Sequence, residues 1–65
     1  MFIKISNTYL NLNNICQVEC LLNPSNQVYV KVYLMNGTVR VFTGEDALEL
    51  INVLDNLVVV IGYPM

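Results

Sequence analysis

Hydrophobic and polar residues alternate along two stretches of the chain, 28–34 and 38–42, on either side of Asn36 and Gly37. Such alternation is typical of a β-strand with one buried face. An Asn-Gly pair between two alternating runs favours a two-residue type I′ turn. The sequence therefore predicts a β-hairpin over residues 28–43, in which Met35 faces Thr38, Leu34 faces Val39, Tyr33 faces Arg40, Val32 faces Val41 and Lys31 faces Phe42.

This register gives the predicted hairpin two different faces. One face is aliphatic, which predicts that it belongs to the core: Val28, Val30, Val32, Leu34, Val39 and Val41. The other face carries aromatic rings, two cations and small polar groups: Tyr29, Lys31, Tyr33, Met35, Thr38, Arg40 and Phe42. An ordinary solvated sheet face does not have this composition, so we expect the second face to take part in function.

Three further strands are predicted before the hairpin, over residues 2–6, 9–12 and 15–22, with loops at 7–8, 13–14 and 23–26. Asn13 and Asn14 predict a tight turn, because asparagine tolerates left-handed φ angles and bonds its own backbone. The cluster of Asn7, Asn11, Asn13 and Asn14 has two interpretations. The amides either form turns or contact a ribose or a base edge.

A helix is predicted over residues 45–56. The side chain of Thr43 is placed to accept a hydrogen bond from the backbone N–H of Asp46, and acidic residues in the first turn favour a helix start. The apolar positions recur at helical spacing, which predicts that the helix covers the aliphatic face of the hairpin. These positions are Ala47, Leu48, Ile51, Leu54 and Leu57, with Leu50 and Val53 at the margins.

Residues 58–61 are β-branched and apolar, which predicts a short buried C-terminal strand. That strand pairs either with a free sheet edge of the same chain or with another subunit. The predicted fold is therefore α+β, in a single domain over residues 1–65. It consists of an antiparallel meander of about four strands, one helix packed on one face and the C-terminal strand.

The composition predicts self-association. Of the 65 residues, 55% are hydrophobic and 12% are charged, whereas about a quarter of a typical globular chain is charged. A monomer of this size cannot cover that much apolar surface, so we expect a homo-oligomer, a dimer or larger. The net charge of −2 argues against general nucleic-acid binding. We expect a cytoplasmic protein without membrane contact, since the chain has no signal-peptide pattern and no long apolar run.

The residues needed for common catalytic chemistry are missing from the sequence. Histidine is absent, so the usual general base is missing. Cys16 and Cys20 would lie roughly 13 Å apart on one strand, too far for a disulfide, and too few other ligands are present for a metal site. We expect both cysteines to be buried and structural. The sequence thus predicts a protein that is not an enzyme and has no cofactor.

The second face of the hairpin remains as the candidate ligand site. Tyr29, Tyr33 and Phe42 are predicted to stack on a base, while Lys31 and Arg40 neutralise phosphate. In an oligomer, two such faces would enclose a small nucleotide. The alternative is that the same face is a subunit interface or simply a second packed face. The protein would then be a protein-interaction or structural module without a small ligand.

The segments 11–15 (NLNNI) and 44–47 (GEDA) resemble a turn and a helix start shared by short phage and bacterial proteins with a β-meander and a helix. In size and layout the chain also resembles phage anti-defence sponges. This resemblance implies a homo-oligomer that sequesters a nucleotide immune signal without cleaving it, in the host cytoplasm if a phage encodes it. The chain departs from that pattern in its few cations, which are Lys4, Lys31 and Arg40.

Overall fold

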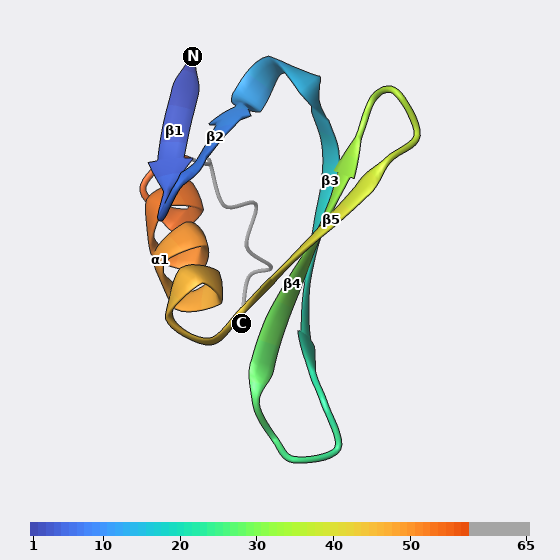
Figure 1. The fold of residues 1–65 in the computed structure, drawn as a ribbon, viewed down its shortest axis with the longest axis vertical. Helices are drawn as coiled ribbons and strands as arrows, with labels where there is room; N and C mark the ends of the chain where they lie inside the picture. Colours follow the sequence, from blue (N-terminus) through green and yellow to red (C-terminus); the bar gives the residue numbers. More distant parts are fainter. Residues whose placement is uncertain (58–65) are drawn as a thin grey trace, which may run out of the picture.

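The computed structural model describes residues 1–57 and confirms the α+β fold. Five strands and a short 3₁₀ turn precede a single helix within this range (Figure 1). In chain order the elements are β1 (Phe2–Ile5), β2 (Thr8–Asn11), η1 (Leu12–Asn14), β3 (Ile15–Leu22), β4 (Val28–Leu34), β5 (Val39–Thr43) and α1 (Gly44–Asp55). The predicted strand at 58–61 lies outside the described residues.

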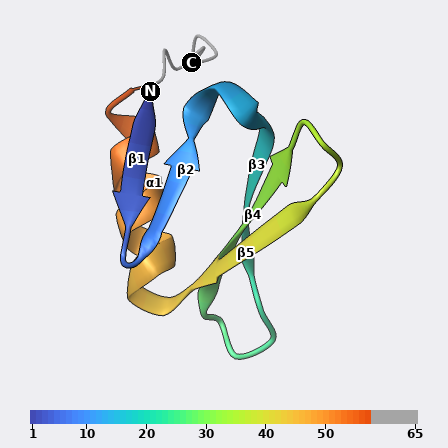
Figure 2. The ribbon, with the colours of Figure 1, turned by 45° about the horizontal axis from the view of Figure 1, so that its top comes forward.

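The strands form two antiparallel sheets, not the single meander that the sequence predicts. One sheet pairs β1 with β2, and the other has the order β3-β4-β5. The η1 turn separates the sheets, and the Asn11 side chain stabilises it by accepting a hydrogen bond from the backbone N–H of Asn13 over 3.0 Å. Of the two interpretations of the asparagine cluster, turn formation therefore accounts for Asn11. Figure 2 shows α1 beside β1 and β2, with the three-stranded sheet as a separate layer.

The core lies where α1 meets both sheets. Seven hydrophobic side chains are buried there: Ile5, Leu10, Val30, Val32, Phe42, Ala47 and Leu50. Ile51 and Leu54 pack against this cluster, so the helix faces the core with positions 47, 50, 51 and 54. The predictions for Leu48 and Leu57 were wrong, since 57% and 47% of their surfaces are exposed, and Leu50, predicted at the margin of the stripe, is fully buried. The stripe formed by positions 47, 50, 51 and 54 and the stripe that contains Leu48 are both apolar and have helical spacing. Contact with the two sheets therefore decides which of the two stripes is buried.

The start of α1 also differs from the prediction. Thr43 has extended backbone angles, but its side chain makes no capping hydrogen bond. Gly44 follows with a φ of +59°, a left-handed angle that glycine adopts at little cost. The chain therefore turns directly from β5 into the helix at Gly44, without the predicted bond from the backbone of Asp46 to Thr43.

The β4-β5 register is shifted by one residue from the predicted one. The loop contains three residues, 35–37: Gly37 N–H donates to the Leu34 carbonyl over 3.0 Å, and Leu34 N–H donates to the Thr38 carbonyl over 2.9 Å. Only Gly37 in this loop has a positive φ, +91°, which excludes a type I′ turn and is typical of a three-residue hairpin loop. Tyr33 consequently pairs with Val39, Val32 with Arg40 and Lys31 with Val41.

The shift exchanges the two faces of β5. Phe42 now lies beside Val30 on the buried face and is only 7% exposed. Val39 and Val41, predicted to be core, are 46% and 54% exposed. The shifted register buries the larger phenyl ring instead of a valine, and a larger apolar side chain gains more free energy on burial.

Candidate functional site

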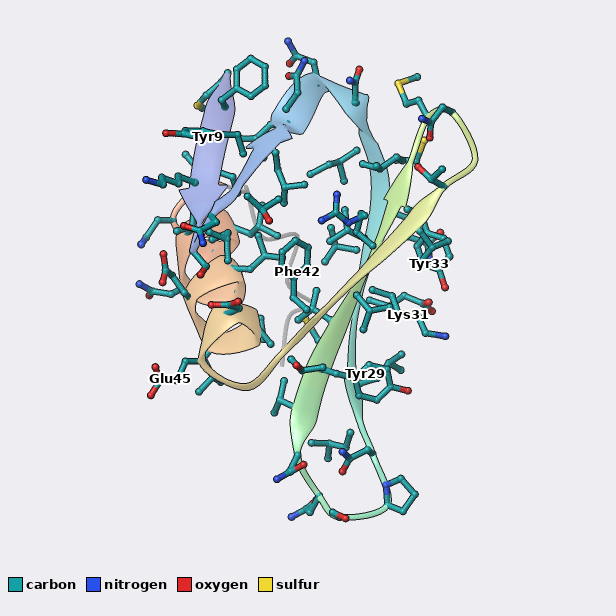
Figure 3. All side chains as sticks on the ribbon, viewed as in Figure 1. Tyr9, Tyr29, Lys31, Tyr33, Phe42 and Glu45 are labelled. Carbon is teal, nitrogen blue, oxygen red and sulfur yellow. The ribbon has the colours of Figure 1, made fainter. Side chains whose placement is uncertain are left out.

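The face of β3-β4-β5 that points away from α1 is the first of two candidate surfaces, and we call it the outer face. Cross-strand pairing arranges its side chains in three rows. The rows are Gln17–Tyr33–Val39, Glu19–Lys31–Val41 and Leu21–Tyr29–Thr43. Figure 3 shows Tyr29, Lys31 and Tyr33 projecting to one side of the sheet, while Phe42 projects to the side of the helix.

The structure brings together three of the five predicted ligand-binding residues. Tyr29, Lys31 and Tyr33 share the outer face and are half-buried. Phe42 is buried in the core, and Arg40, although exposed, lies opposite Val32 on the other face of the sheet. The predicted convergence of all five side chains was wrong, because it depended on the two-residue hairpin loop.

The predicted cation–aromatic pairs are also replaced. Tyr33 does not face Arg40, and Lys31 does not face Phe42. The ammonium group of Lys4 on β1 instead lies 5.4 Å from the ring centre of Tyr9, its cross-strand partner on β2. The three cations named above therefore belong to three different surfaces, and Lys31 is the one that the outer face offers to an anion.

The outer face contains a carboxylate that the sequence-based site omitted. Glu19 lies opposite Lys31 across the β3-β4 ladder. The Tyr33 hydroxyl donates a hydrogen bond to Oε1 of Glu19 over 2.5 Å. This bond raises the pKa of Tyr33, and desolvation of the phenol and the charge of Glu19 act in the same direction. The sequence could have placed Glu19 on this face, from the alternation within residues 15–22 and an antiparallel pairing of that strand with β4.

The outer face is thus mixed in character. Its edge carries the exposed Val39 and Val41, its middle carries the Glu19–Lys31 row, and two tyrosines flank that row. The helix packs on the opposite side, where Val30, Val32 and Phe42 are buried. Within residues 1–57 no helix or strand covers the outer face, so apolar surface that strand alternation normally buries is in contact with solvent.

The second candidate surface is a groove between β3 and the C-terminal part of α1, with a volume of about 480 Å³. Its lining is mainly apolar and comprises Leu12, Ile15, Cys16, Gln17, Val18, Cys20, Ile51, Leu54, Asp55 and Leu57. Both cysteines are exposed free thiols, so the prediction that they are buried was wrong. A β-bulge between Ile15 and Gln17 displaces Cys16 from the ladder. Cys20 lies opposite Val30 on the helix side of the sheet, but its thiol is exposed there.

Residues 1–57 contain no cluster of three or more His, Cys, Asp or Glu side chains that could hold a metal ion. No helix in this range is long and apolar enough to cross a membrane. Glu45 extends outward at the start of α1 (Figure 3), apart from both candidate surfaces.

Comparison with known proteins adds no relative. No family model matches the chain, and no curated protein and no solved structure is similar to it.

Proposed function

We propose that this protein is a non-enzymatic interaction module that forms a homo-oligomer through its outer face. The observation that carries the proposal is the exposure of Val39 and Val41 in the sheet, at 46% and 54%. Leu21 and the rings of Tyr29 and Tyr33 continue the same apolar surface across three strands. Contiguous exposed apolar surface of this kind is typical of protein–protein interfaces.

The charges of the outer face favour a second copy of the chain as its occupant. Glu19 and Lys31 are direct neighbours in adjacent strands, so the face is self-complementary. In a two-fold arrangement each surface patch meets the same patch of the other copy. Glu19 would then lie against Lys31 of the second copy, and the apolar residues around this pair would be buried together.

The dimensions of the face indicate weak association. Neighbouring strands lie about 4.8 Å apart and extend about 3.3 Å per residue, so the outer face of the three strands measures roughly 15 Å by 20 Å. A standard stable interface buries about 800 Å² on each partner, which is more than this face provides. We therefore expect a concentration-dependent dimer with a dissociation constant in the micromolar range or weaker.

Nucleotide sequestration, the anti-defence role that the sequence resemblance implies, stays a prediction. Tyr29, Lys31 and Tyr33 on one face support it, because rings and a cation can hold a base and a phosphate. Arg40 and Phe42 do not contribute to that face, and Glu19 would repel an anion. Self-association accounts for the whole outer face, whereas nucleotide binding uses only part of it.

The test compares Val41→Glu with Met35→Glu by sedimentation velocity at protein concentrations from the low micromolar to the millimolar range. A glutamate at position 41 would face Lys31 across the β4-β5 ladder, an opposite-charge pair that the strand tolerates. Met35 is an exposed apolar residue of the hairpin loop, so its replacement changes the net charge equally without altering the outer face.

We expect wild type and Met35→Glu to dimerise with similar affinity, and Val41→Glu to bind at least about tenfold more weakly, a loss of about 1.4 kcal/mol. Far-UV circular dichroism checks that both variants fold. A wild-type protein that stays monomeric at millimolar concentration contradicts the proposal, and so does Val41→Glu dimerising like wild type. Isothermal titration of the wild type with a panel of cyclic and linear nucleotides tests the sequestration prediction separately.

A further inference from the structure

The loop between β4 and β5 carries a chemically reactive pair of residues, Asn36 and Gly37. Of the nine asparagines in the chain, Asn36 is the one that precedes a glycine. Asn36 is exposed, and Figures 1 and 2 show the loop at the end of the hairpin that is far from α1. Asparagine is thermolabile in proteins, because the next backbone nitrogen attacks its amide carbon. Glycine favours this attack, since it has no side chain beside the nitrogen.

The reaction converts the amide into an acid and consumes only water. The backbone nitrogen of Gly37 gives up its proton to solvent and bonds to Cγ of Asn36, and the Cγ–Nδ2 bond breaks to release ammonia. Water then opens the five-membered succinimide ring at one of its two carbonyls. One opening leaves aspartate, and the other leaves isoaspartate, in which the backbone continues through the side chain. Either product carries one more negative charge than asparagine.

The geometry of the loop keeps the two reacting atoms from bonding. The hydrogen bond from Gly37 N–H to the Leu34 carbonyl, 3.0 Å long, closes a β-turn over residues 34–37. Neither Met35 nor Asn36 has a positive φ, which is typical of a type I turn with a ψ of about 0° at Asn36. At this angle the Gly37 nitrogen eclipses the backbone nitrogen of Asn36, whereas ring closure requires it to eclipse Cβ. The peptide between the two residues must therefore rotate, which breaks the bond to Leu34.

Thr38 makes two further hydrogen bonds that hold the loop closed. Its backbone N–H donates to Oδ1 of Asn36 over 3.0 Å, and its hydroxyl donates to the same oxygen over 2.5 Å. The rotation that closes the ring carries Thr38 away from the amide, so both bonds are lost before the attack. The reaction therefore proceeds from an opened loop, and its rate depends on the population of that opened form.

We propose that Asn36 is a self-modification site of this protein, and that Thr38 controls its rate by keeping the loop closed. The proposal concerns the hairpin loop and does not depend on self-association through the outer face. One hydrogen bond of ordinary strength changes the population of the opened loop about fivefold. The bond from the Thr38 hydroxyl is the one that a substitution removes while leaving the backbone donors in place.

The isoaspartate product also affects the hairpin. Its extra backbone carbon lengthens a loop whose length sets the register between β4 and β5. The aspartate product leaves the backbone unchanged and retains an oxygen for the bonds from Thr38. Isoaspartate at position 36 should therefore weaken the hairpin, whereas aspartate at the same position should not.

The first test follows deamidation of each asparagine in the full-length protein by peptide mass spectrometry, during incubation in mildly alkaline buffer. It compares wild type with Thr38→Val, which removes the hydroxyl donor, and with Thr38→Ser, the matched control that keeps it. We expect Asn36 to react first in all three proteins. Its rate should be about fivefold higher in Thr38→Val than in wild type, and within about twofold of wild type in Thr38→Ser. Equal rates in the two variants, or faster reaction at another asparagine, overturn the proposal.

Unfolding in urea separates the effect of the loop from that of the neighbouring side chain. The unfolded chain has no loop to open, so all three proteins should react there at equal rates, at least about tenfold faster than folded wild type. A difference between Thr38→Val and Thr38→Ser that persists in urea overturns the proposal, because the loop is then not its cause. Far-UV circular dichroism checks that both variants are folded without urea.

The consequence for the hairpin is tested on the modified protein. Chromatography isolates the isoaspartate form, and Asn36→Asp serves as the reference for the aspartate product. We expect the isoaspartate form to unfold at a lower urea concentration than Asn36→Asp, and Asn36→Asp to unfold close to wild type. Equal midpoints for the isoaspartate form and Asn36→Asp contradict the proposed effect of modification on the hairpin.

Discussion

The hydroxyl of Tyr33 on β4 donates a hydrogen bond to Oε1 of Glu19 on β3, at 2.5 Å. The bond crosses the ladder diagonally, because Tyr33 is paired with Gln17 and Glu19 with Lys31. It thereby connects two rows of the outer face and fixes the position of the carboxylate beside Lys31.

Tyr33→Phe should remove a pH-dependent part of the stability. The folded protein raises the pKa of Tyr33, so it binds the phenolic proton more tightly than the unfolded chain, whose tyrosines titrate at about pH 10. The stabilisation is therefore complete below the unfolded pKa and is lost as the pH rises through the folded pKa. Urea unfolding between pH 8 and 11 should show a wild-type advantage over Tyr33→Phe that disappears at the alkaline end.

Tyr29→Phe is the control for that measurement. It removes a hydroxyl from the same face and leaves the bond from Tyr33 to Glu19 intact. A wild-type advantage over Tyr33→Phe that stays constant across the pH range would contradict the coupling between Tyr33 and Glu19.

Phe42→Ala should destabilise the protein far more than Val41→Ala. Phe42 is buried against the core cluster, whereas Val41 is more than half exposed. Truncating a buried phenylalanine costs about 3 kcal/mol or more, and an exposed valine costs less than about 1 kcal/mol. Urea unfolding followed by circular dichroism measures both. A larger loss of stability from Val41→Ala than from Phe42→Ala would instead support the register in which Val41 belongs to the core and Phe42 faces outward.

Gly37→Ala should destabilise the hairpin by about 1 kcal/mol, because alanine at a φ of +91° is strained. Nothing lies within 4 Å of a Cβ at this position, so the cost is due to backbone conformation and not to a clash. Gly37→Asn is the matched comparison, since asparagine adopts left-handed angles more readily, and it should lose less. If the two variants are equally stable in urea unfolding, the three-residue loop is not the one described.

If a nucleotide binds the outer face, Lys31→Ala should weaken its binding at least about tenfold, as expected for the loss of a charge-assisted contact. Arg40→Ala should leave the affinity nearly unchanged, since Arg40 lies on the other side of the sheet. Isothermal titration with each variant gives both dissociation constants. A strong effect of Arg40→Ala with none from Lys31→Ala would place the ligand on a different surface.

The sequence predicts the candidate site in part: the residues on β4 are placed correctly, and those on β5 are not. Alternation within β4 correctly places Tyr29, Lys31 and Tyr33 on one face, because neighbouring residues of a strand always point to opposite sides. The face of β5 depends on the hairpin loop, and one more loop residue turns every β5 side chain to the other side. Arg40 and Phe42 were therefore assigned to the wrong face.

Cys16 and Cys20 illustrate a different limit. Their spacing gives their separation along β3, but their exposure depends on the bulge at Cys16 and on how far α1 extends over the sheet. Neither feature is encoded in a local pattern. The same holds for Leu48 and Leu50, which are equally apolar but differ in exposure because α1 contacts two sheets at once.

By itself, the sequence determined the α+β class, the strand and helix segments and the two faces of β4. These properties follow from periodicity, turn residues and apolar spacing, which act over a few neighbouring residues. Only the tertiary structure decided the β4-β5 register, the division into two sheets, the buried stripe of α1 and the position of Glu19 beside Lys31. Each of these is a choice between alternatives of similar local energy, and burial of Phe42 and Leu50 in one shared core selects among them.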